Sequence, residues 1–222
     1  MKQNTKKLAC LGVGVLAAFV LWTLLVCIVD VEAIGAQASR VGFAQFNATV
    51  HKLTGVNMTL YTITDWLGLI PIAVAFGFAV FGLVQWISRK SFLAVDRDIL
   101  ALGGFYLVVM AVYALFEVLV INHRPILING IPEASYPSST TMLVVCVIPA
   151  AIIQFKKRIQ NTPLRRVLCV AMAAFTAFMV VGRLFSGVHW ITDIIGGLFF
   201  GAGIVIIYQA IVTRCNIKNK TK

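Results

Sequence analysis

"LACLGVGVLAAFVLWTLLVCIV", from Leu8 to Val29, is a stretch of 22 residues without a charged side chain. A helix needs about 20 mostly apolar residues to cross the hydrocarbon core of a bilayer. Two further stretches of similar length carry no charge, Trp66 to Ser88 and Ile194 to Thr213. Each of the three stretches therefore predicts a membrane-spanning helix.

Three more apolar runs complete the pattern: Ile99 to Ile121, which is interrupted by Glu117, Thr140 to Phe155, and Val167 to Gly182. The chain is 60% hydrophobic and 12% charged, which is too little charge to cover the surface of a soluble domain of 222 residues. We predict an all-α bundle of six transmembrane helices in one domain, residues 1–222. The expected helices cover about residues 8–29, 66–88, 99–121, 139–155, 167–183 and 190–213.

The net charge of +11 would suit nucleic acid, but its distribution favours a membrane topology. Fifteen of the 19 basic residues lie on one side if six helices alternate. They cluster at the N-terminus (Lys2, Lys6, Lys7), at Arg89, Lys90 and Arg97, at Lys156, Lys157, Arg158, Arg165 and Arg166, and in the tail (Arg214, Lys218, Lys220, Lys222). Cytoplasmic loops carry such an excess. We therefore expect a multi-pass plasma-membrane protein with both termini in the cytoplasm and no nucleic-acid partner.

Some features of the outer segments and the cysteines narrow the alternatives. A signal peptide cut after "AQA", Ala36 to Ala38, is less favoured than a retained first helix, because the apolar stretch is long. Phe43, Phe46, Val50 and Leu53 recur at helical spacing and indicate an interfacial helix, whereas His51 has no evident partner and is expected at the surface. None of the five cysteines forms a CxxC pair, so neither a disulfide framework nor a zinc site is indicated.

A few ionisable residues lie at the outer ends of the last four expected helices, where they are costly in a membrane and indicate a functional site. They are Glu117, His123, Arg124, Arg183, His189 and Asp193. The alternative for the two arginines is a place in the lipid headgroup layer. Convergence of all these groups on one face favours a site.

His189 and Asp193 are four residues apart and would stack on one face of a helix. The carboxylate would then fix the imidazole tautomer and leave the other nitrogen free to attack. Arg183 and Arg124 would supply planar cations that suit phosphate. "PSST", Pro137 to Thr140, would add the free amides of a helix start, which favour anions, with Ser138 or Ser139 as the cap. Together these groups predict phosphoryl transfer.

The arrangement resembles the type 2 phosphatidic acid phosphatase (PAP2) superfamily, whose membrane members have six helices and the motifs K-x6-R-P, P-S-G-H and S-R-x5-H-x3-D. The corresponding stretches here are "EVLVINHRP" (117–125), "PSST" (137–140) and "GRLFSGVHWITD" (182–193). The resemblance implies that Arg124, Arg183 and Ser138 bind phosphate, that His189 forms a phosphohistidine, and that Asp193 orients it. Ser139 is a further candidate for phosphate binding because of its place at the helix start. We expect no metal and no cofactor, because the two arginines and the helix start supply the positive charge and no cluster of Asp or Glu is present to hold a metal.

Three positions depart from the family pattern. Glu117 replaces the Lys, Ser139 and Thr140 replace Gly and His, and Gly182 replaces the Ser. The missing His is the family's proton donor to the leaving group, and loss of a general acid costs about 10²–10⁴ in rate. A departing phosphate, with a second pKa of about 6, needs that proton less than an alkoxide does. We therefore expect a preference for lipid diphosphates, such as undecaprenyl diphosphate, over monoesters such as phosphatidic acid.

His123, Glu117 and Glu133 are candidates for a replacement acid, although we expect Glu117 to pair with an arginine. The predicted function is a membrane phosphatase that acts on a lipid phosphate or diphosphate at the outer face. The alternatives are a catalytically impaired member that binds lipid phosphates and a lipid phosphotransferase that uses the same intermediate. The sequence does not identify the lipid chain, the acceptor, the oligomeric state or the organism.

Overall fold

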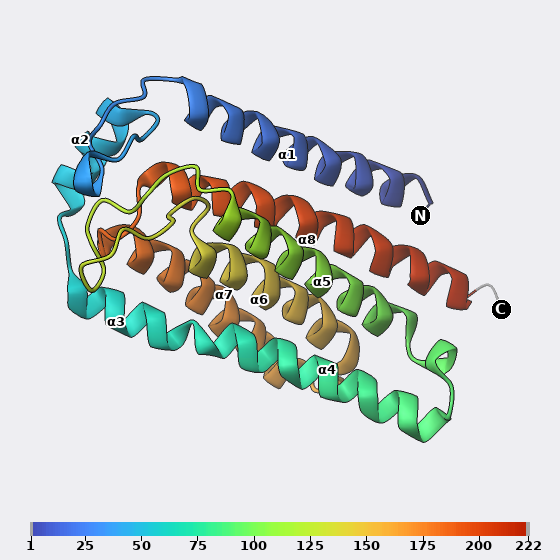
Figure 1. Ribbon diagram of the computed structural model, residues 1–222. Helices are drawn as coiled ribbons and strands as arrows, with labels where there is room; N and C mark the ends of the chain where they lie inside the picture. The colour runs from blue at the N-terminus through green and yellow to red at the C-terminus, as the bar shows by residue number, and fades with distance from the viewer. Residues whose placement is uncertain (1, 221–222) are drawn as a thin grey trace.

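The computed structural model describes residues 2–220, with only the backbone described for Lys2 and for residues 216–220, so Lys222 of the basic tail lies outside the described residues. It contains eight α-helices and no strand within these residues (Figure 1). The helices are α1 (Lys2–Ile28), α2 (Ala44–Thr54), α3 (Met58–Leu67), α4 (Leu69–Arg89), α5 (Arg97–Val118), α6 (Ser139–Arg158), α7 (Thr162–Phe185) and α8 (Ile191–Lys220). Six helical stretches are long and apolar enough to cross a membrane, with α3 and α4 forming one of them. The predicted all-α, six-span fold is confirmed.

The second span begins at Met58, well before the expected start at residue 66. Asn57 caps α3, because its side-chain oxygen accepts a hydrogen bond from the Leu60 amide at 2.9 Å. Gly68 then joins α3 to α4 almost in line. The sequence-based boundary was wrong because polar residues such as Thr62 and Asp65 interrupt the apolar pattern without ending the helix.

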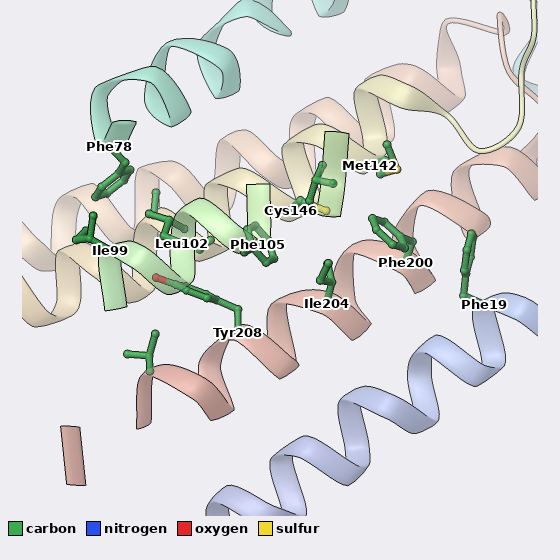
Figure 2. Packing of buried hydrophobic residues seen from close by; sticks show 14 of the residues in the cluster. Phe19, Phe78, Ile99, Leu102, Phe105, Met142, Cys146, Phe200, Ile204 and Tyr208 are labelled. Atoms are coloured by element: carbon green, nitrogen blue, oxygen red, sulfur yellow. The ribbon is translucent and has the colours of Figure 1, made fainter. Parts of the chain in front are cut away.

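Helices α6 and α8 form the inside of the bundle. Of the 18 most apolar consecutive residues in each of these two spans, 56% are buried, against 11–22% in the other spans. Figure 2 shows Leu102 and Phe105 of α5 and Cys146 of α6 packed toward Ile204 and Tyr208 of α8. The other four spans lie at the periphery of the bundle and therefore present most of their apolar side chains to lipid.

Small residues bring α1 close to α8. A Cβ on Gly12 would stand 2.6 Å from Ile207 Cγ1, and one on Gly203 would stand 2.8 Å from Leu16 Cδ2. Close backbone approach of this kind drives helix association in lipid, where burial alone gives little. The first and the last helix of the chain, α1 and α8, therefore pack against each other along their length (Figure 1).

Both termini and the α4–α5 connection lie at one end of the bundle (Figure 1). At this end Asp98, which is 2% exposed, contacts Arg158 at 2.9 Å and Lys157 at 3.0 Å. Asp96 binds Arg89 at 2.8 Å and Arg158 at 3.2 Å. Part of the basic charge that predicts a cytoplasmic face is thus used to hold α4, α5 and α6 together.

The opposite end is covered by α2 and by the segment between α5 and α6 (Figure 1). Asn47 of α2 donates to the Thr192 hydroxyl at 3.0 Å. His51 Nε2 lies 3.0 Å from the Gly187 carbonyl oxygen, and its ring packs on Trp190. The expectation that His51 is an unpartnered surface residue was wrong, because α2 folds back over the turn that joins α7 to α8.

Candidate active site

His189 lies in the turn between α7 and α8 and is 3% exposed. It does not begin the last helix, as the sequence suggested, because α8 starts at Ile191. Its Nδ1 therefore lies 3.8 Å from Asp193 Oδ2, beyond ordinary hydrogen-bond distance. The predicted direct contact between the two side chains is thus replaced by an indirect one.

Ser135 makes that indirect contact. Its hydroxyl donates to Asp193 Oδ2 at 2.5 Å, and its Oγ lies 3.1 Å from His189 Nδ1. A hydroxyl has one proton to give, so with that proton on Asp193 the oxygen accepts from Nδ1–H of the imidazole. The chain of hydrogen bonds fixes the tautomer and puts the lone pair on Nε2, where it accepts a hydrogen bond from Arg183 Nη2 at 3.3 Å.

Asp193 is completely buried and is held by three donors. Besides Ser135, Asn122 Nδ2 donates to Oδ1 at 3.2 Å, and the Trp190 amide donates to Oδ2 at 2.9 Å. Sequence reasoning missed both Asn122 and Ser135. The sequence signal for both was their position: Asn122 lies two residues before Arg124, and Ser135 lies three residues before Ser138.

Arg183, at the end of α7, faces the free nitrogen of the imidazole. Its Nη2 lies 3.3 Å from His189 Nε2, and its Nη1 lies 3.4 Å from Thr64 Oγ1 and 3.7 Å from Asp65 Oδ1. The side chain is 1% exposed, and its Nε has no hydrogen-bond partner within residues 2–220. A buried guanidinium with an unused N–H is prepared to bind an anion.

Arg124 lies on the other side of the same site. The Tyr61 ring is shared by the two guanidinium groups, 5.0 Å from that of Arg183 and 5.9 Å from that of Arg124. Nη2 of Arg124 contacts Glu133 Oε2 at 3.1 Å, whereas its buried Nε and Nη1 have no partner in the described chain. The expectation that Glu117 pairs with an arginine was wrong, because Glu133 is closer in the folded loop.

The "PSST" stretch starts α6. Ser138 is the N-cap, and its Oγ accepts from the Thr141 amide at 3.5 Å. The Ser138 amide already donates to the Asp193 carbonyl at 3.1 Å. The amides of Ser139 and Thr140 are then the free donors at this helix end, since the first N–H groups of a helix have no acceptor within it. The roles of Ser138 and Ser139 in phosphate binding remain predictions.

A cavity of about 270 Å³ opens beside Arg124, between α5 and the start of α6. Glu117, His123, Glu133 and Ser139 contribute polar groups to its lining, and Phe116 and Met142 contribute apolar ones. Glu117, His123 and Glu133, the three candidates for a replacement acid, thus line the same cavity as Arg124. A polar cavity with an apolar side fits an amphiphilic ligand.

The electrostatics of the site keep His189 neutral. Burial, and then the positive charges of Arg124 and Arg183, hold the pKa of His189 well below its ordinary value of 6.5. A neutral imidazole with Nδ1–H bonded to Ser135 carries its lone pair on Nε2, the atom that faces Arg183. The arrangement therefore combines an unprotonated ring nitrogen with two guanidinium groups whose chemistry suits an anion.

Within residues 2–220, no group of three or more His, Cys, Asp or Glu side chains gathers where it could hold a metal ion. The positive charge of the site comes instead from the two arginines and the start of α6. These groups suit the equatorial oxygens of a phosphoryl group, where charge is stabilised during transfer.

The fold and the site thus define a multi-pass helical membrane protein with a histidine and two arginines at one end of its bundle. The chain belongs to the PAP2 superfamily, whose family model matches residues 72–217. No curated protein matches the chain. Among solved structures, it is similar to one described as the first transmembrane PAP2 type phosphatidylglycerolphosphate phosphatase from Bacillus subtilis. That likeness has 16% identity and a TM-score of 0.49, and it covers 95% of this chain and 97% of that chain.

Proposed function

We propose that this protein is a membrane phosphatase that removes a phosphoryl group from a lipid phosphate, and preferentially from a lipid or polyprenyl diphosphate, through a phosphohistidine at His189. The observation that carries the proposal is the orientation of His189. Its Nδ1 is bonded through Ser135 to Asp193, and its Nε2 lies 3.3 Å from Arg183. Membership of the PAP2 superfamily supports the same chemistry.

The preference for a diphosphate follows from the residue at position 140. Thr140, where the family has its proton donor, has a hydroxyl that hardly ionises near neutral pH. A departing phosphate tolerates this because its second pKa is about 6. The unused N–H groups of Arg124 and the adjacent polar cavity could receive the second phosphate of such a substrate.

The site is proposed to face the outside of the plasma membrane, with both termini in the cytoplasm. Both termini and the α4–α5 connection, which carry part of the basic charge, lie at the end of the bundle opposite the turn between α7 and α8 (Figure 1). An amphiphilic substrate could then reach the cavity beside Arg124 from the outer leaflet. The substrate is a membrane lipid, and no cofactor is required.

The test is to incubate the purified protein in detergent with undecaprenyl diphosphate that is radiolabelled in its terminal phosphate. We expect acid-labile label on the wild-type protein and none on His189→Ala. Release of phosphate from phosphatidic acid and phosphatidylglycerophosphate, measured in parallel, should be slower than from the diphosphate. Fast monoester hydrolysis with negligible diphosphate hydrolysis would refute the preference.

A second candidate, a lipid-phosphate-binding protein without turnover, is favoured by the same absence of a proton donor at Thr140. The two candidates differ in the covalent step. Binding of the labelled lipid without label on His189, and without phosphate release, would support the binder.

A further inference from the structure

We propose that Asp65, on α3, is a further catalytic residue, which accepts a proton from the water that releases phosphate from His189. This inference rests on the proposed phosphatase function. Asp65 belongs to none of the three motifs, and the family model matches only from residue 72 onward. The assignment therefore comes from contacts of this chain's own α3.

The first argument is the shared guanidinium of Arg183. Its Nη2 lies 3.3 Å from His189 Nε2, and its Nη1 lies 3.7 Å from Asp65 Oδ1. One planar group therefore separates the nucleophilic nitrogen from the carboxylate. A phosphoryl group carried on Nε2 and bound by this guanidinium would lie beside Asp65.

The second argument is access to water. The side chain of Asp65 is 59% exposed, whereas those of Arg183 and His189 are each 1% exposed. Asp65 is thus at the surface of the protein, near the start of the span that begins at Met58, whereas the other two groups are buried. A water molecule that approaches the phosphohistidine from this side would pass within reach of the carboxylate, as a general base requires.

The third argument is that α3 lies against two of the positions where this chain departs from the family motifs. A Cβ on Gly182 would stand 2.7 Å from Thr64 Cγ2, so the family's Ser at this position would require the Thr64 side chain of α3 to move. A Cβ on Gly68, at the end of α3, would stand 3.7 Å from Thr140 Cγ2. The helix that carries Asp65 therefore reaches the place of the missing His, and Gly182 permits its approach.

Other candidates have no comparable contact. Glu133 is bound to Arg124 at 3.1 Å. Glu117 and His123 line the cavity beside Arg124. In the described part of the chain, no hydrogen bond or ion pair joins any of the three to Arg183 or His189, which leaves Asp65 as the carboxylate paired with the guanidinium that faces Nε2.

The proposed reaction has two steps. His189 Nε2 first bonds to the terminal phosphorus, and the P–O bond to the remaining phosphate breaks, with its electron pair leaving on that oxygen. Water then attacks the phosphorus while Asp65 takes one of its protons, the P–N bond breaks, and its electron pair returns to Nε2. Inorganic phosphate departs, and the Asp65 proton passes to solvent or to the next leaving oxygen.

The experiment compares Asp65→Asn with the wild-type protein on terminally radiolabelled undecaprenyl diphosphate, with label on His189 and released phosphate measured together. We expect label to form at the wild-type rate and to accumulate, while steady-state release falls by about 10²–10⁴. Asp65→Glu should restore release. Asp30→Asn, a matched change at an outer aspartate that binds the Gln45 amide, should behave like the wild type.

The contrary results separate the two proposals. Wild-type release by Asp65→Asn would overturn the role of Asp65 and leave the phosphatase intact. Loss of labelling in Asp65→Asn with a raised KM would also overturn it, because that pattern indicates positioning of Arg183 instead. Absence of both label and release in the wild-type protein would refute the phosphatase function and the role of Asp65 together.

Discussion

Ser135→Ala tests how His189 is oriented. The change removes the oxygen that lies 3.1 Å from His189 Nδ1 and the hydroxyl that donates to Asp193. Asp193 Oδ2 is 3.8 Å from Nδ1, too far to replace the lost acceptor without movement. The Nδ1–H group would therefore be buried without a partner.

A buried donor without a partner costs about 1–3 kcal/mol. The cost falls on the tautomer that carries its proton on Nδ1, which is the tautomer with the nucleophilic lone pair on Nε2. At about 1.4 kcal/mol for each factor of ten, phosphohistidine formation should slow by about 5- to 150-fold. KM should change little, because Arg124 and Arg183 keep their positions.

The assay is rapid-quench measurement of label transfer from a terminally labelled lipid diphosphate. Thr49→Ala is the matched control, since it removes an exposed hydroxyl that bonds within α2. A thermal unfolding curve in the same detergent checks that Ser135→Ala is folded. Wild-type phosphorylation by a folded Ser135→Ala protein would refute the hydrogen-bond relay and show that Asp193 orients the imidazole directly.

Three further predictions follow from the same geometry. Thr140→His should raise hydrolysis of phosphatidic acid relative to that of a diphosphate, by up to about 10²-fold, as measured by phosphate release; an unchanged ratio would mean that another group is the acid. The folded protein holds the pKa of His189 well below 6.5, so as pH falls the unfolded chain binds a proton at this residue before the folded protein does. The free energy of unfolding should therefore fall as pH drops below about 6.5. His189→Gln should weaken this dependence in thermal denaturation at several pH values, and an identical pH profile would contradict it. Gly182→Ala should destabilise the protein by about 1–3 kcal/mol, because the new Cβ would stand 2.7 Å from Thr64 Cγ2. The double variant with Thr64→Ser should recover part of the loss of thermal stability. Additive losses in the double variant would argue against this contact.

The sequence predicted the fold class, because a bilayer imposes a length and an apolar composition that can be read residue by residue. It also predicted, from the order and spacing of three motifs, that Arg124, Arg183 and His189 lie together at one end of the bundle. The ends of the helices were less predictable. Polar residues of α3 looked like loop, since the cap at Asn57 that starts the helix has only a weak sequence signal.

Contacts between distant segments could not be read in this way. Ser135 meets His189 across 54 residues, and Thr64 meets Arg183 across 119. Glu133 rather than Glu117 pairs with Arg124 because the α5–α6 segment folds back on itself.

The sequence by itself thus determined the six-span membrane fold and predicted a set of candidate phosphate-binding residues at one end of it. Only the tertiary structure decided which nitrogen of His189 faces Arg183, which hydroxyl accepts the hydrogen bond from its Nδ1–H, and that Asp65 lies beside Arg183. The physical reason is distance. Membrane insertion depends on summed apolar composition, whereas a tautomer or a proton acceptor is set by hydrogen bonds of about 3 Å, which only packing of the helices can fix.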